Sequence, residues 1–134
     1  MKLFTPVFRL TTILCLILLM GCDEDKNFEE LAPYRTYTAL LNQQDEDAPV
    51  ATVLENTLNI TIEWSRTSRG KYLGTLSQPV DINKSTLWVS TPPTHAVMRI
   101  RFNSPTEIYL EAGQGVNFHT DTYSNVSLEL KVYK

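Results

Sequence analysis

The stretch Val126-Ser127-Leu128-Glu129-Leu130-Lys131-Val132-Tyr133 alternates apolar residues with polar or amphipathic ones along its whole length. Successive side chains of a β-strand point to opposite faces, so this pattern predicts a strand with one buried and one exposed face. The same alternation recurs in four earlier stretches, at 58–64, 98–102, 108–112 and 116–120. Many of their apolar residues are β-branched or aromatic, which favours strands over helices.

Turn-forming residues separate these stretches and outline a fold of short strands. Pro, Gly, Asn and Ser cluster at 66–70, 77–79, 92–93, 103–105, 113–115 and 121–125. Weaker strand signals lie at 35–41, 50–54, 72–76 and 87–90. No amphipathic helix of useful length is evident after the first 22 residues. About eight or nine short strands predict an all-β fold, a single antiparallel β-sandwich, with a small β-barrel as the alternative.

Turn positions in the second half of the chain give an expected register. A turn at 104–106 pairs Phe102 with Ile108, and a turn at 113–115 continues the meander through 116–120 to the last strand. One face of this expected sheet is apolar, and the other gathers polar side chains into a candidate partner surface. Its residues are Arg99, Arg101, Tyr109, Glu111, His119 and Glu129.

His119 beside Tyr109 and Arg101 comes closest to a catalytic arrangement, because histidine titrates near neutral pH. Ser127 is adjacent in this register, but no third group is expected to orient the pair. The sequence contains no phosphate-binding loop and no G-x-S-x-G or H-E-x-x-H motif. We therefore predict that the protein is not an enzyme, with a small hydrolase around His119 as the least favoured hypothesis.

Metal and cofactor binding are not expected. The chain has two histidines, His95 and His119, and lacks the usual zinc-ligand spacings. Asp45 and Asp81 each begin a stretch similar to a calcium loop, but neither stretch has the glutamate that closes such a loop. A weak calcium site in one of these loops is the remaining alternative.

The two tryptophans have different sequence settings. Trp64 is in phase with Leu58 and Ile60 and is predicted to lie in the core. Trp88 lies in a continuous apolar run at 87–89, so we expect it in the core or over a sheet edge. If its ring is exposed, Trp88 together with Tyr109 is a candidate platform for stacking on sugar rings.

The N-terminus has the layout of an export signal. Lys2 and Arg9 precede an apolar run at 13–20, which at about 1.5 Å per residue is too short to cross a hydrocarbon core about 30 Å thick. Leu19-Met20-Gly21-Cys22 ends this run and resembles the lipobox of bacterial lipoproteins. The resemblance implies that residues 1–21 are a cleaved signal peptide and that acylated Cys22 holds the protein on a membrane of the cell envelope.

Residues 22–33 are predicted to form a lipidated linker ahead of a domain at 34–134. Five acidic residues and one lysine occupy 23–30 and should keep this stretch extended. An aspartate directly after the cysteine resembles the inner-membrane retention signal of enteric bacteria. The acidic run instead resembles the surface-export signal of Bacteroidota lipoproteins. Two locations are therefore expected alternatives: the periplasmic face of the inner membrane, and the outer membrane or cell surface.

Charge restricts the class of partner. Without Lys2 and Arg9 the chain has ten basic and fifteen acidic residues, a net charge of −5, which argues against nucleic-acid binding. We therefore predict a lipid-anchored envelope lipoprotein whose β-sandwich acts as a binding or assembly module for an envelope protein. The alternative is a surface module that binds carbohydrate or another ligand through Trp88, Tyr109 and the row of Arg99 and Glu111.

Overall fold

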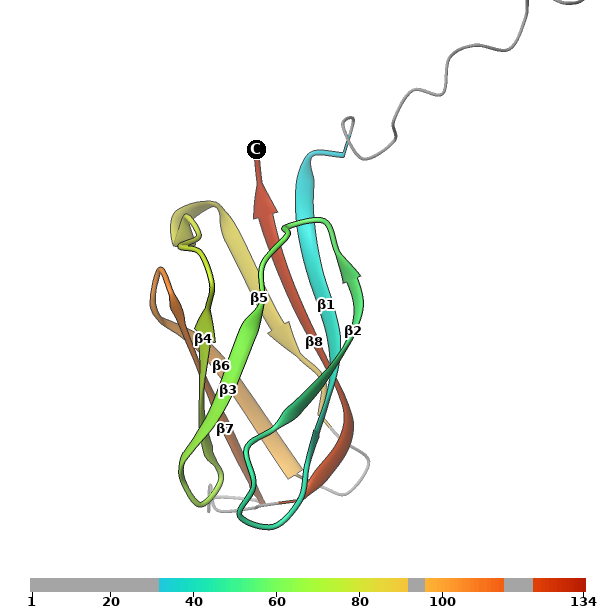
Figure 1. Cartoon of the computed structure of the whole chain (residues 1–134), viewed down its shortest axis with the longest axis vertical. Coiled ribbons are helices and arrows are strands. Elements are labelled where there is room, and N and C mark those ends of the chain that lie inside the picture. The colour runs from blue at the N-terminus through green and yellow to red at the C-terminus, as the bar shows by residue number, and fades with distance from the viewer. Residues whose placement is uncertain (1–31, 92–95, 115–121) are drawn as a thin grey trace, which may run out of the picture. The chain divides into compact units, whose positions relative to one another are not determined.

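Eight strands form two antiparallel sheets in the part of the chain that the computed structural model describes, which is residues 32–91, 96–114 and 122–134 (Figure 1). The first sheet has the order β2 (Val50–Asn56), β1 (Tyr34–Gln43), β8 (Tyr123–Tyr133) and β5 (Ser85–Val89). The second has the order β3 (Ile62–Ser68), β4 (Lys71–Leu76), β7 (Glu107–Gln114) and β6 (Ala96–Ser104). A single turn of 3-10 helix, η1 (Ile82–Lys84), precedes β5. The sheets pack together without closing into a barrel, so the predicted β-sandwich is confirmed.

Strand β8 occupies the interior of the first sheet, between β1 and β5. Its alternation has the predicted effect, because Val126, Leu128 and Leu130 are completely buried while the residues between them are half-buried on the opposite face. Leu128 lies opposite Ala39 of β1 and Val89 of β5. This strand therefore anchors one wall of the core.

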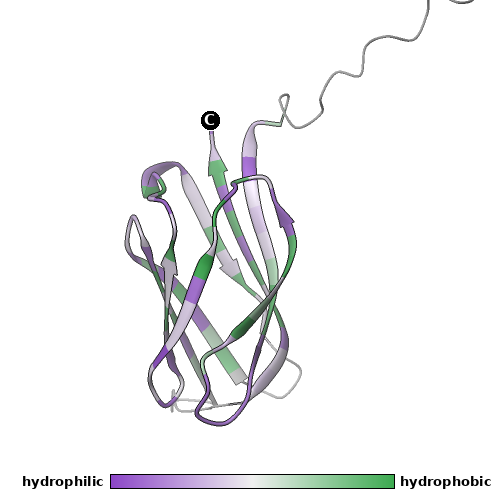
Figure 2. Ribbon diagram, in the orientation of Figure 1, coloured by the Kyte–Doolittle hydropathy of each residue, from purple (hydrophilic) through white to green (hydrophobic). Residues whose placement is uncertain are grey.

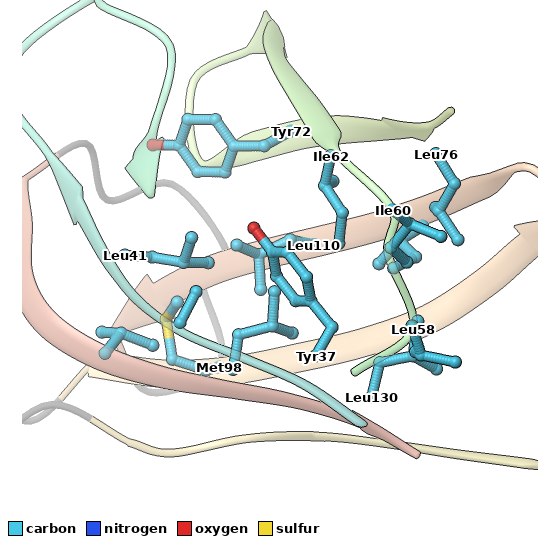
Figure 3. Close-up of a cluster of buried hydrophobic side chains, with 14 of the residues drawn as sticks. Tyr37, Leu41, Leu58, Ile60, Ile62, Tyr72, Leu76, Met98, Leu110 and Leu130 are labelled. Atoms are coloured by element: carbon cyan, nitrogen blue, oxygen red, sulfur yellow. The ribbon is translucent and has the colours of Figure 1, made fainter. Parts of the chain in front are cut away.

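The core fills the space between the two sheets. Figure 3 shows Tyr37 and Leu130 from the first sheet and Leu110 and Met98 from the second directed into one apolar cluster. Hydrophobic and hydrophilic segments alternate along the strands in Figure 2, as expected for strands with one buried face. Burial also raises the pKa of the Tyr37 phenol, because the charged phenolate is disfavoured in an apolar environment.

The hairpin of β6 and β7 has the predicted register, with Phe102 opposite Ile108 and Ile100 opposite Leu110. The expected continuation of the meander from β7 to β8 in one sheet is wrong. The other side of β7 pairs with β4, where Leu110 faces Tyr72, and β8 belongs to the first sheet. The expected strand at 116–120 lies outside the described residues. Period-two alternation tells which face of a strand is buried, but it does not tell which strand lies beside it.

The stretch 58–64 forms a strand only in its last part, since β3 begins at Ile62. Leu58 and Ile60 are buried as predicted, but between them Asn59 adopts a left-handed conformation with φ 56°. The Asn56 side chain holds this segment by donating to the carbonyl oxygen of Ile60 at 2.8 Å and accepting from its amide at 3.3 Å. The prediction of an unbroken strand is therefore wrong, because this segment is the crossing from the first sheet to the second.

Trp64 packs against the core but is only half-buried itself. The prediction that it lies in the core is therefore confirmed only in part. Trp64 lies opposite Gly74 of β4. A Cβ atom at position 74 would stand 3.0 Å from the indole ring and 2.9 Å from Cγ2 of Ile62. Glycine is therefore required here by the close approach of the ring, and the indole covers the strand backbone.

The first and last strands bring the two ends of the described domain together. β1 and β8 are antiparallel neighbours (Figure 1). Tyr34 lies opposite Tyr133, and their ring centroids are 5.6 Å apart. The backbone amide of Lys134 donates to the carbonyl oxygen of Pro33 at 3.0 Å. Gln43 and Tyr123, at the other ends of these two strands, are also opposite each other.

Candidate functional site

The outer face of the second sheet contains four of the six residues that the sequence assigned to a partner surface. The strand register places them with two residues of β4 in adjacent cross-strand rows. We call this set the Tyr109 face, and its residues are Lys71, Leu73, Arg99, Arg101, Tyr109 and Glu111.

An arginine stacked on a tyrosine occupies one of these rows. The guanidinium carbon of Arg101 lies 4.5 Å from the centroid of the Tyr109 ring. Arg101 is exposed, whereas Tyr109 and the neighbouring Leu73 are half-buried. The row therefore presents a cation held over an aromatic ring, next to an apolar side chain.

The second row places a carboxylate between two cations. Glu111 of β7 lies opposite Lys71 of β4 on one side and opposite Arg99 of β6 on the other. Opposite charges on directly paired positions of antiparallel strands attract each other. The Tyr109 face therefore carries both signs of charge around a tyrosine.

Glu129 does not belong to this face, and this corrects the prediction from the meander. Because β8 lies in the first sheet, Glu129 is on the outer face of that sheet. Its Oε1 lies 3.0 Å from Nζ of Lys131. The hydrogen bond to Glu129 and its negative charge raise the pKa of Lys131. The same ammonium lies 5.0 Å from the centroid of the Tyr34 ring. The remaining predicted residue, His119, lies outside the described part of the chain.

Trp88 lies on β5, which is an edge strand of the first sheet, and 56% of its surface is exposed. The expectation that it lies in the core is wrong, and its ring is exposed on an edge strand. It faces away from the core opposite Glu129, whereas Tyr109 is on the other sheet. The proposed sugar platform of Trp88 and Tyr109 is therefore wrong, because the two rings belong to different layers.

A pocket of about 580 Å³ lies at the end of the sandwich where β1 ends and β8 begins. One wall comes from the β1–β2 connection, including Gln44, Asp45 and Asp47, and the other from Thr122 to Ser124 at the start of β8. Both segments are at the same end of the domain in Figure 1. We call this cavity the Gln43 pocket, after the residue that joins its walls.

Gln43 connects the two walls through its side-chain amide. Its Nε2 donates to the backbone oxygen of Asp45 at 2.6 Å and to that of Asp47 at 3.1 Å. Its Oε1 accepts from the backbone amide of Thr122, which is 79 positions away in sequence. The side chain is 4% exposed, so these bonds satisfy a buried polar group and fix the position of both walls.

Sequence reasoning missed this pocket. Gln43 is in phase with the buried residues Tyr37, Ala39 and Leu41, so a polar side chain at the end of an apolar face was the available signal. A buried amide requires partners, and those partners come from a distant segment that no local pattern identifies.

The described residues contain no group of three His, Cys, Asp or Glu side chains placed to hold a metal ion. Within the same ranges, no helix is long and apolar enough to cross a membrane. Comparisons with protein-family models, with curated proteins and with solved structures find no match to this chain. Its function is therefore inferred from its own residues.

Proposed function

We propose that this protein is a lipid-anchored lipoprotein of the cell envelope whose β-sandwich binds a partner protein through the Tyr109 face. The similarity of residues 19–22 to a lipobox supports the anchor at Cys22. The stack of Arg101 on Tyr109 is the observation that carries the binding role. The acidic linker that follows Cys22 would be extended by charge repulsion and would hold the domain at a distance from the inner or the outer membrane.

Residue types on the Tyr109 face favour protein recognition. Tyrosine and arginine are enriched among the residues that contribute most to protein interfaces. The ring of Tyr109 holds the guanidinium of Arg101 in place before a partner arrives, which lowers the entropy lost on binding. The alternating charges of Lys71, Glu111 and Arg99 would set the orientation of a partner with the complementary pattern.

Replacing Cys22 with alanine should abolish acylation and leave an unprocessed precursor that still carries residues 1–21. The thiol of Cys22 is the group that accepts the lipid in the proposed class. Intact mass and partitioning into detergent would measure both effects. Cys15→Ala is the matched control and should change neither, because Leu14 is too large for the position before a lipidated cysteine. A wild-type protein without acyl mass that stays in the aqueous phase would contradict the anchor.

The double variant Arg101→Ala/Tyr109→Ala should lose the partner while keeping its fold. Substitutions on a sheet surface usually change stability by no more than about 0.5 kcal/mol each, so the melting temperature should move little. Crosslinking and pull-down with the native lipidated protein would identify the partner and measure its recovery. The control is Lys84→Ala/Thr86→Ala, which removes two exposed side chains near β5. Equal partner recovery by the double variant and wild type would refute this surface.

A further inference from the structure

We propose that the Gln43 pocket is a second binding site, separate from the Tyr109 face, and that its ligand is a neutral, hydroxyl-rich molecule such as an uncharged glycan. A pocket of about 580 Å³ has the size of a small-molecule or oligosaccharide subsite. Three properties lead to this assignment: a fixed shape, a mixed polar and apolar lining, and a charge that excludes anions.

Hydrogen bonds within the protein hold the walls of the pocket in place. Gln43 bonds both walls, and the backbone amide of Asp45 adds a further bond to Oγ1 of Thr122 at 3.4 Å. On the outer side, Oδ1 of Asn42 accepts from the backbone amide of Asn125 at 2.9 Å. A site whose walls are already fixed loses less conformational entropy when a ligand enters.

The backbone around the pocket is held in uncommon conformations. Asp45, Thr122 and Asn125 have positive φ angles of 50°, 116° and 53°. For threonine, whose side chain is branched at Cβ, such an angle is a marked outlier. Conformations of this kind persist where surrounding bonds enforce them, and they concentrate at binding sites. Here Gln43 bonds Asp45 and Thr122, and Asn42 bonds Asn125.

The lining combines groups that recognise hydroxyls with groups that contact C–H surfaces. The carboxylates of Asp45 and Asp47, the amide of Gln44 and the hydroxyl of Ser124 supply hydrogen-bonding groups, and Ala48 and Val50 supply apolar contact. Paired carboxylate and amide groups suit a sugar, whose neighbouring hydroxyls both donate and accept. Apolar side chains beside them suit the C–H face of a sugar ring.

The negative charge of the pocket lining excludes anionic ligands. Two aspartates and no lysine or arginine are among the described residues that line the pocket, and Glu46 adds a third acid to the same loop. Phosphates, sulfates and acidic sugars would be repelled by these carboxylates. Among the described residues, no three His, Cys, Asp or Glu side chains are placed together to hold a metal ion, so the pocket walls favour a neutral ligand over a bare cation.

The pocket is distant from the point where the predicted linker joins the domain. The predicted linker joins the domain at Tyr34, and the pocket lies at the opposite end of the ten-residue strand β1. A strand of that length spans about 30 Å. The attachment point of the linker is therefore separated from the pocket by the full length of the strand.

The test uses the full-length lipidated protein in detergent micelles on an array of neutral and acidic oligosaccharides, followed by calorimetric titration of the neutral sugars that bind. Wild type should bind neutral sugars with a Kd of about 1 mM or tighter. The variant Gln44→Ala/Asp47→Ala should weaken this binding about tenfold or more, because each side chain contributes a hydrogen bond. Both side chains are exposed, so the fold is preserved.

Two control variants show whether the sugar binds in the pocket itself. Glu46→Ala removes a neighbouring charge that does not line the pocket and should leave sugar affinity unchanged. Arg101→Ala/Tyr109→Ala should also leave it unchanged, so failure of the protein-binding surface would not be mistaken for failure of the pocket. Any of three results would overturn the proposal: no neutral sugar bound, full affinity in the Gln44→Ala/Asp47→Ala variant, or binding of calcium alone in a titration without sugar.

Discussion

Leu128→Ala is expected to lower the free energy of unfolding by about 3 to 5 kcal/mol, the largest effect predicted for any single substitution in this protein. Leu128 is completely buried and lies between two strands of the first sheet, opposite Ala39 and Val89. Neighbours on both sides belong to hydrogen-bonded strands, so the cavity left by the missing side chain cannot collapse easily. A domain of this size has a total stability of roughly 5 to 15 kcal/mol, so the variant should lose a large share of it.

Urea denaturation of the chain from Asp23 onward, followed by circular dichroism, measures this change. Leu54→Ala is the matched control, because the same atoms are removed from a side chain that is 60% exposed on the edge strand β2. It should change stability by no more than about 0.5 kcal/mol. Similar losses in the two variants would mean that the interior of the sandwich is not at β8.

Trp64→Ala should destabilise the protein by about 3 kcal/mol, at the lower end of the range for buried tryptophans because the ring is half-buried. Gly74→Ala should cost about 1 to 3 kcal/mol, since its new methyl group would stand 3.0 Å from the indole. The two costs should not add. With the indole removed, two of the three atoms nearest to the new methyl group are absent, although Cγ2 of Ile62 at 2.9 Å still has to move.

A double-mutant cycle of Trp64→Ala and Gly74→Ala in thermal or urea unfolding measures this coupling. Trp64→Phe is a useful third variant, because the indole Nε1 is buried and has no hydrogen-bond partner among the described residues. Phenylalanine keeps most of the ring contact and removes that unsatisfied group, so it should cost less than alanine. Strictly additive losses in the cycle would show that the ring does not lie on the backbone of β4.

Local patterns in the sequence predicted the buried faces of β6, β7 and β8, but not which strands are neighbours. The alternation along β8 placed Leu128 in the core correctly, and the turn at 104–106 gave the pairing of Phe102 with Ile108. Glu129 was assigned to the wrong layer because an alternating strand satisfies the same pattern in either sheet. Burial can also alternate without a strand, as Leu58 and Ile60 do around the left-handed Asn59.

The two candidate sites differ in how far the sequence could reveal them. Arg101 and Tyr109 face each other across a short hairpin, so a turn prediction was enough to bring them together. The Gln43 pocket depends on a bond between residues 79 positions apart, and only the assembled first sheet creates it. The one local sign of the pocket in the sequence is Gln43, a polar residue at a position where an apolar side chain would continue the buried face of β1.

The first and last strands of the domain, β1 and β8, are neighbours, and this affects how the domain resists a pulling force. Pulling apart the predicted linker at Tyr34 and the C-terminus at Lys134 would open the antiparallel pair of β1 and β8 like a zipper, loading one hydrogen bond at a time. A load between the linker at Tyr34 and the pocket wall at 122–124 would instead act along the strands, because that wall begins β8 at the far end of its antiparallel pair with β1. The hydrogen bonds between β1 and β8 would then be sheared together. We therefore expect the domain to yield at a lower force when it is pulled between Tyr34 and Lys134 than when it is pulled between Tyr34 and the start of β8.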